Sequence, residues 1–169
     1  MKPQFLAAFA VVLIVLSFSF WKSRADVIPT KTDDLQAQIE AALYTRAEFF
    51  GSQALVPIPT AEARTRMEAL HAQYPQASLI ARHLSQLDEK LGNPDLAEKE
   101  IEHYAELEHQ SVESLELVAA FQNRQARFDH EAKTLERLLN LVPKTQKVSM
   151  LQRLMAHARK HNLTAYLGP

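Results

Sequence analysis

A recurring spacing constrains this chain more than any other feature of its sequence. Three alanines that each open an Ala-rich, apolar-periodic stretch, Ala63, Ala97 and Ala132, stand 34 and 35 residues apart. A period of that length accommodates two helices and their turns. Because each helix pair leaves an apolar face uncovered, neighbouring pairs must stack to bury it. The spacing therefore predicts an all-α chain built as a solenoid of antiparallel helix pairs.

Composition agrees with this prediction and removes several kinds of site. The 169 residues include three Gly and no Cys. Without Cys the chain has no disulfide, no thiolate-bound metal and no covalently attached haem. Three Gly leave no material for a phosphate-binding loop, and no dinucleotide or P-loop motif occurs. We therefore expect no resident cofactor, no metal site and no catalytic residues.

The best-defined unit covers residues 78–107. Its first helix, predicted over residues 78–91, carries apolar residues at helical spacing. A turn follows, in which Asn93 suits the position before the second helix and Pro94 suits its first position. That second helix turns Ala97, Ile101 and Tyr104 inward.

The next unit repeats this plan. Its first helix runs from Val112 past Phe121, its turn is predicted at Phe128-Asp129, and its second helix carries Ala132 before Pro143 ends it. We interpret His130 as a one-residue insertion, since this would account for the spacing of 35.

These units resemble the tetratricopeptide repeat family over about residues 60–163. The matching positions are Leu84-Ser85, Leu91-Gly92, Ala97 with Ile101, Ala63 with Met67, Tyr74-Pro75 and the segment 126–132. They also fit related solenoids such as Sel1-like repeats.

The resemblance implies a right-handed superhelix of about 2.5–3.5 repeats, whose inner groove is lined by the first helices and binds extended peptides or helices. It assigns six partner-binding residues to that groove: Arg82, Gln86, Glu89, Glu113, Glu116 and Asn123. The alternative is that these are ordinary solvated positions.

An apolar run precedes the repeats. The nineteen residues from Pro3 to Trp21 carry no charge, and as a helix they would span roughly 28 Å, about one hydrocarbon core. We interpret residues 1–22 as a transmembrane anchor of a repeat domain outside the cytoplasm. The alternatives are a signal segment cleaved near Ala25, with release to the periplasm, and a buried core helix.

Two further segments join this run to the repeats. Residues 23–34 are predicted to be a linker, and residues 35–59 a helix followed by a Pro-containing loop. The helix is expected over residues 35–50, capped by Asp33 or Asp34. Its apolar side would carry Leu35, Ile39, Leu43, Phe49 and Phe50. The repeats then occupy residues 60–169.

Charge is segregated along the repeats. Residues 88–116 hold ten acids and two bases, whereas residues 117–169 hold three acids and nine bases. This pattern indicates a solvated surface, electrostatic steering of a partner, or head-to-tail self-association. Nucleic acid is an unsuitable partner, because acids outnumber bases beyond the apolar run and the basic end has few aromatic residues.

Two clusters have the spacing of a ligand site. His157 and His161 lie four residues apart, but Arg159 and Lys160 between them disfavour a metal. Glu98, Glu102 and Glu106 form an acidic stripe that suits a loosely held cation or a partner's Lys or Arg.

The function predicted from these features is that of a non-enzymatic, membrane-anchored adaptor or scaffold subunit, which binds protein partners in a membrane or cell-envelope complex. Its alternatives are a self-associating structural protein, a helical-superhelix envelope enzyme and a cytochrome-maturation chaperone.

Overall fold

The computed structural model describes residues 31–167. The expected anchor or signal segment and most of the expected linker lie outside these residues. Within them, no helix combines the length and the apolar character that crossing a bilayer requires. The chain divides into two units, Met1–Ala37 and Gln38–Pro169. Of the first unit, only the start of helix α2 (Lys31–Leu43) belongs to the described residues.

Helix α2 corrects two predictions. It begins at Lys31, so the linker ends before residue 31 and not at residue 34. Asp34 therefore lies inside the first helical turn and does not cap a helix that starts later. An acid there is favourable because the N-terminal end of a helix carries partial positive charge.

A β-hairpin replaces the second half of the predicted helix over residues 35–50. Strand β1 (Tyr44–Phe49) pairs antiparallel with β2 (Ser52–Pro57). Between them Phe50 and Gly51 both have positive φ, 49° and 77°, as the two central residues of a type I′ turn require. The backbone N–H of Ile58 donates to the carbonyl of Leu43 and closes the base of the ladder. The fold is thus mainly helical rather than wholly so.

From residue 60 onward the helices repeat in pairs. The first helix of each pair is α4 (Ser78–Lys90), α6 (Val112–Arg124) or α8 (Lys144–His161). The second helix is α3 (Thr60–Gln73), α5 (Pro94–Leu107) or α7 (Phe128–Leu141). These elements match the predicted helix-pair repeat, including Asn93 before α5, Pro94 at its start and Pro143 after α7.

The period is 34 residues, which corrects the predicted insertion at His130. Helices α3, α5 and α7 each have 14 residues and begin at residues 60, 94 and 128. Glu131, not Ala132, therefore occupies the position of Ala63 and Ala97, and all three are buried. The turn between α6 and α7 lies at Gln125–Arg127, with Ala126 at φ 55°, so Phe128 and Asp129 already belong to α7.

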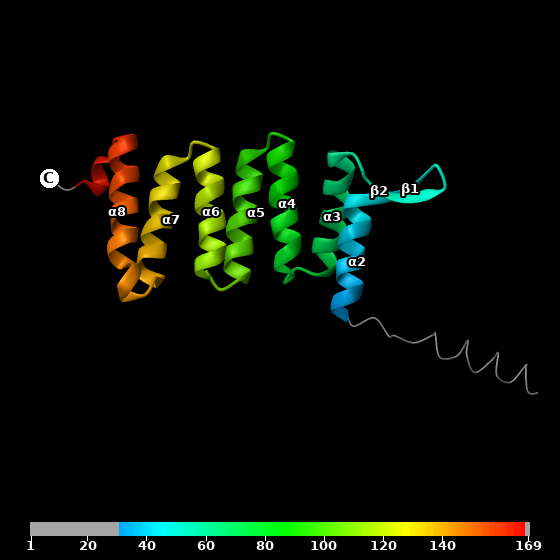
Figure 1. Cartoon of the computed structure of the whole chain (residues 1–169), viewed down its shortest axis with the longest axis horizontal. Helices are drawn as coiled ribbons and strands as arrows, with labels where there is room; N and C mark the ends of the chain where they lie inside the picture. The colour runs from blue at the N-terminus through cyan, green and yellow to red at the C-terminus, as the bar shows by residue number, and fades with distance from the viewer. Residues whose placement is uncertain (1–30, 168–169) are drawn as a thin grey trace, which may run out of the picture. The chain divides into compact units, whose positions relative to one another are not determined.

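Helices α3 to α8 lie side by side in chain order, from green to red in Figure 1, and each packs against the next. A continuous apolar core runs through α4–α8. Its members include Ile101, Leu115, Phe121, Leu135 and Leu154. After α8 a short 3-10 helix, η1 (Thr164–Tyr166), packs Tyr166 against this core.

Candidate binding site between helices α3 and α5

Neighbouring repeats are joined by ion pairs. On the first helices, Glu89 of α4 accepts hydrogen bonds from Arg124 of α6 at 3.1 and 3.0 Å, and Glu116 pairs in the same way with Arg153 of α8. The hydrogen bond from Arg124 lowers the pKa of Glu89. Some of the charges that are segregated along the sequence therefore form ion pairs within the chain, because acids of one repeat pair with bases of the next.

The second helices are joined more extensively. Arg127 binds Asp95 and Glu98, and Arg137 of α7 donates to both carboxylate oxygens of Glu102 on α5. Glu98 is largely buried, and burial by itself raises its pKa. Hydrogen bonds with His130, Gln122 and Arg127 outweigh burial and hold the pKa of Glu98 below its usual value. Two members of the acidic stripe, Glu98 and Glu102, are thus paired with arginines of the same chain and not with a cation from outside.

One repeat earlier, at the junction of α3 and α5, this pairing is missing. The 34-residue period places Glu68 and His103 where the next junction has Glu102 and Arg137. Glu68 instead pairs with Arg64 on its own helix, at 2.7 Å. His103 lies 3.6 Å from Glu106 and stacks on His71 of α3, with ring centroids 5.6 Å apart.

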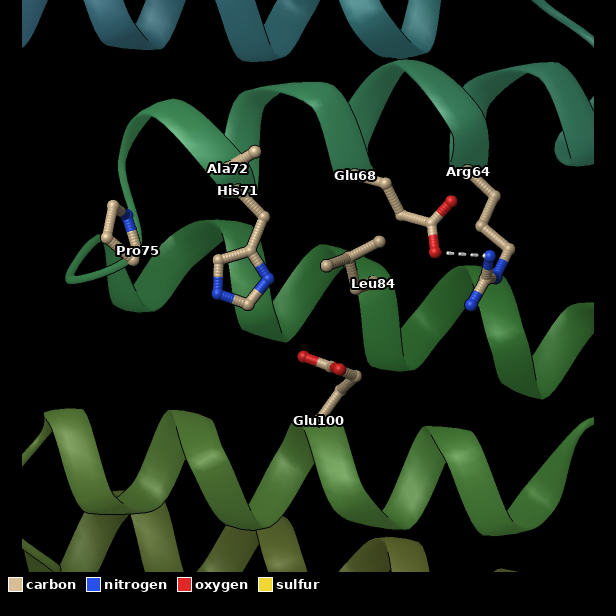
Figure 2. Close-up of a pocket in the computed structure, with 7 residues that line it drawn as sticks. All are labelled: Arg64, Glu68, His71, Ala72, Pro75, Leu84 and Glu100. Carbon is tan, nitrogen blue, oxygen red and sulfur yellow. Dashed lines mark hydrogen bonds and ion pairs between the residues drawn. The ribbon is translucent and has the colours of Figure 1, made fainter.

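Two surface pockets lie at this junction. The first, of about 400 Å³, is lined from α3 by Arg64, Glu68, His71 and Ala72, from α4 by Leu84, from α5 by Glu100, and by Pro75. Figure 2 shows the carboxylate of Glu100 pointing from α5 toward His71 and Leu84. The second, of about 470 Å³, is lined by His71, Lys99, Glu100, Glu102, His103 and Glu106. We name the two pockets together the α3–α5 cleft, since they share His71 and Glu100.

Glu100 is the most unusual residue of the cleft. Its Oε2 atom is buried and has no hydrogen-bond partner among the described residues. A buried carboxylate oxygen without a donor is unfavourable by about 1–3 kcal/mol. Four glutamates line the cleft, against Arg64 and Lys99, and Arg64 is already bound to Glu68 and to the buried Asp88. The arrangement favours a positively charged group over an anion.

The six predicted groove residues lie elsewhere, and none of them lines the α3–α5 cleft. Glu89 and Glu116 form the ion pairs described above. Asn123 donates to Glu131 at 2.7 Å, and the guanidinium of Arg82 lies 6.0 Å from the ring centroid of Tyr104. Gln86 and Glu113 are exposed. Their assignment as partner contacts stays a prediction.

The sequence did contain a signal for the cleft. Spacing within one helix selects the acidic stripe of Glu98, Glu102 and Glu106, and it leaves out Glu100, which lies on a different face of α5. Glu98 lies 2.8 Å from the ring of His130 on α7, whereas Glu100 lines a pocket together with residues of α3. Charges at equivalent positions of successive repeats identify this junction, because His103 stands where the next repeat has Arg137.

The histidine pair considered as a metal site packs around an aromatic ring. Phe128 stacks on His161, and the Nε2 atom of His157 lies 2.9 Å from the carbonyl oxygen of Phe128. The other ring nitrogen of His157 lies 3.5 Å from Glu131. These contacts join α7 to α8. Within residues 31–167, no group of three or more metal-ligating side chains is arranged around a common point.

Known proteins similar to this chain were found among solved structures. No protein-family model matches the chain, and no curated protein matches it. Among solved structures, it is similar to the first TPR of Spaghetti (RPAP3) bound to HSP90 peptide SRMEEVD. That match has 14% sequence identity and a TM-score of 0.43, and it covers 61% of this chain and 82% of that chain.

Proposed function

We propose that this protein is a membrane-anchored, non-catalytic adaptor that binds a protein partner in the α3–α5 cleft. The observation that carries the proposal is the buried, unpartnered Oε2 atom of Glu100 in a cleft where four glutamates outnumber Arg64 and Lys99. Helical repeats supply an extended, rigid surface of the kind that suits protein binding.

The chemistry of the cleft selects a Lys or Arg side chain of the partner. Each pocket has the volume to accept a long side chain, and both have Glu100 in the wall. A guanidinium or ammonium group in the cleft would pair with the carboxylate charge of Glu100, whose Oε2 atom has no donor among the described residues. The flat rings of His71 and His103 offer a surface on which a guanidinium stacks.

The support for membrane anchoring comes from the sequence. The uncharged run from Pro3 to Trp21 supports an anchor, and a tethered adaptor would meet its partner at the bilayer surface. The exposed Lys144, Lys147, Arg159 and Lys160 of α8 supply a second, basic contact for an acidic partner surface.

Binding of charged peptides to the full-length protein in detergent tests the cleft directly. The probes are two fluorescent peptides of equal length, one with a central Arg flanked by neutral residues and one with Gln in its place. We expect anisotropy to show binding of the Arg peptide, with affinity falling as salt is raised. Glu100→Gln should weaken it about tenfold, as expected for loss of a charge-assisted hydrogen bond.

The matched control is Glu113→Gln, which removes an equal charge from an exposed position of α6 outside the cleft. If both variants bind the Arg peptide as the wild type does, or if the Gln peptide binds equally well, the cleft does not select a cation. Loss of binding in Glu113→Gln alone would instead support the predicted groove on the first helices.

A further inference from the structure

The hairpin β1–β2 concentrates exposed apolar side chains. Ten large hydrophobic residues are exposed within residues 34–167, and four of them lie in this hairpin. Phe50 is fully exposed, Phe49 and Leu55 are 55% and 51% exposed, and Tyr44 is 40% exposed. The charged residues of the two strands are Arg46 and Glu48, so the hairpin has no net charge.

The tip of the hairpin is strained as well as apolar. Phe50 has φ 49°, which is costly for a bulky residue, and Asn or Gly is preferred at this position of a type I′ turn. A two-stranded hairpin is by itself marginally stable in water. Turn stability therefore does not explain a phenylalanine here, whereas contact of its ring with an apolar surface does.

We propose that the tip of this hairpin, Phe49 and Phe50, inserts into the interfacial region of the same bilayer that holds the N-terminal anchor. This inference rests on the anchor of the proposed function. Aromatic side chains favour the membrane–water interface, and shallow insertion of an uncharged tip suits that region.

Chain length supports the bilayer as the occupant. Residues 22–30 reach at most about 30 Å when extended, and the 13 residues of α2 add about 20 Å. The start of β1 is therefore confined to within about 50 Å of the predicted membrane boundary at Trp21. Such confinement raises the effective concentration of the membrane surface around the hairpin, so that weak insertion by two rings suffices.

The test uses the full-length protein reconstituted into phosphatidylcholine vesicles with brominated acyl chains, which quench indole fluorescence on contact. Trp21 is the single tryptophan of the chain, so its fluorescence in the wild type reports the anchor. In a Trp21→Phe background, Phe50→Trp reports the hairpin tip. We expect a blue-shifted emission and about a twofold loss of fluorescence relative to vesicles without bromine.

Two further variants separate contact from misfolding. Ala120→Trp in the same background places an indole on an exposed position of α6 and should not be quenched. Phe49→Trp reports the tip without changing Phe50, and adding Phe50→Asn should reduce its quenching by about half. Asn favours the backbone conformation of this turn, so this loss would arise from the missing ring rather than from an unfolded hairpin.

Three results of the quenching experiment would contradict the inference, each for a different reason. Quenching of Trp21 without quenching at residues 49 and 50 would show that the anchor is in the bilayer and the hairpin is not, which overturns this inference. Absence of quenching at Trp21 would refute the proposed anchor and the inference with it. A blue shift that depends on protein concentration and not on bromine would assign the hairpin tip to a second copy of the chain and overturn bilayer insertion.

Discussion

Arg137 on α7 donates through a single nitrogen, Nη1, to both carboxylate oxygens of Glu102 on α5, at 3.1 and 3.0 Å. The pair joins two second helices one repeat apart, and it has no equivalent one repeat earlier, where Glu68 and His103 occupy the same positions. Repeat proteins gain stability from such contacts between nearest neighbours. The ion pair of Glu102 with Arg137 therefore stabilises the α5–α7 junction, and the α3–α5 junction, which holds the cleft, lacks it.

Removal of this pair should give a modest and non-additive loss of stability. Both side chains are about one-third exposed, so we expect a coupling free energy of about 0.5–1 kcal/mol between Glu102→Gln and Arg137→Gln. Urea unfolding of the two single variants and the double variant measures it. The coupling should shrink at high salt. Additive effects of the two substitutions would show that the ion pair contributes nothing to the junction.

A guanidinium introduced at the α3–α5 junction should stabilise the protein and abolish peptide binding together. His103→Arg copies the position of Arg137, whose equivalent partner at this junction is Glu68, and adds a donor to the pocket that Glu100 lines. We expect the free energy of unfolding to rise by about 0.5 kcal/mol, since the new ion pairs outweigh the lost histidine stack. Thermal unfolding and anisotropy with the Arg peptide are the measurements.

The control is His109→Arg, which adds the same group at an exposed position outside the cleft. It should leave peptide binding unchanged. A His103→Arg variant that still binds the peptide as the wild type does would place the binding site outside the cleft.

The helix pairs were predictable because local chemistry and burial agree along residues 60–161. Apolar spacing, Pro94 and Pro143 each indicate the same boundaries. The hairpin was not predictable from apolar spacing. A helical spacing runs through Leu35, Ile39 and Leu43, and Phe49 and Phe50 extend it by coincidence. The helix ends at Leu43 because the backbone of residues 44–57 pairs in the ladder between β1 and β2, a pairing that apolar spacing does not encode. The cleft depends on which charges face each other between repeats, a relationship that patterns within one helix do not contain.

Acid should weaken the α5–α7 junction through Glu98. Its pKa is lowered in the folded protein from the usual glutamate value of 4.5, so its stabilising contribution is present above pH 4.5 and is lost as pH falls through the lowered pKa. Glu98→Gln should cost about 1–2 kcal/mol at neutral pH and flatten the decline of stability below pH 4.5. Urea unfolding from pH 7 downward gives both quantities. Parallel pH curves for the variant and the wild type would contradict the role assigned to Glu98.

Alanine at two glycines with the same backbone conformation should have different effects. Gly51 in the hairpin turn and Gly92 between α4 and α5 have φ of 77° and 76°, and an added Cβ would meet no atom within 4 Å at either. Each substitution therefore introduces backbone strain of about 1 kcal/mol without a clash. Gly92→Ala should lower the free energy of global unfolding by that amount, because its turn joins two helices that pack on each other. Gly51→Ala should leave global unfolding unchanged and accelerate amide exchange in β1 and β2 alone, since the hairpin opens locally. Equal losses of global stability in the two variants would show that the hairpin unfolds together with the repeats.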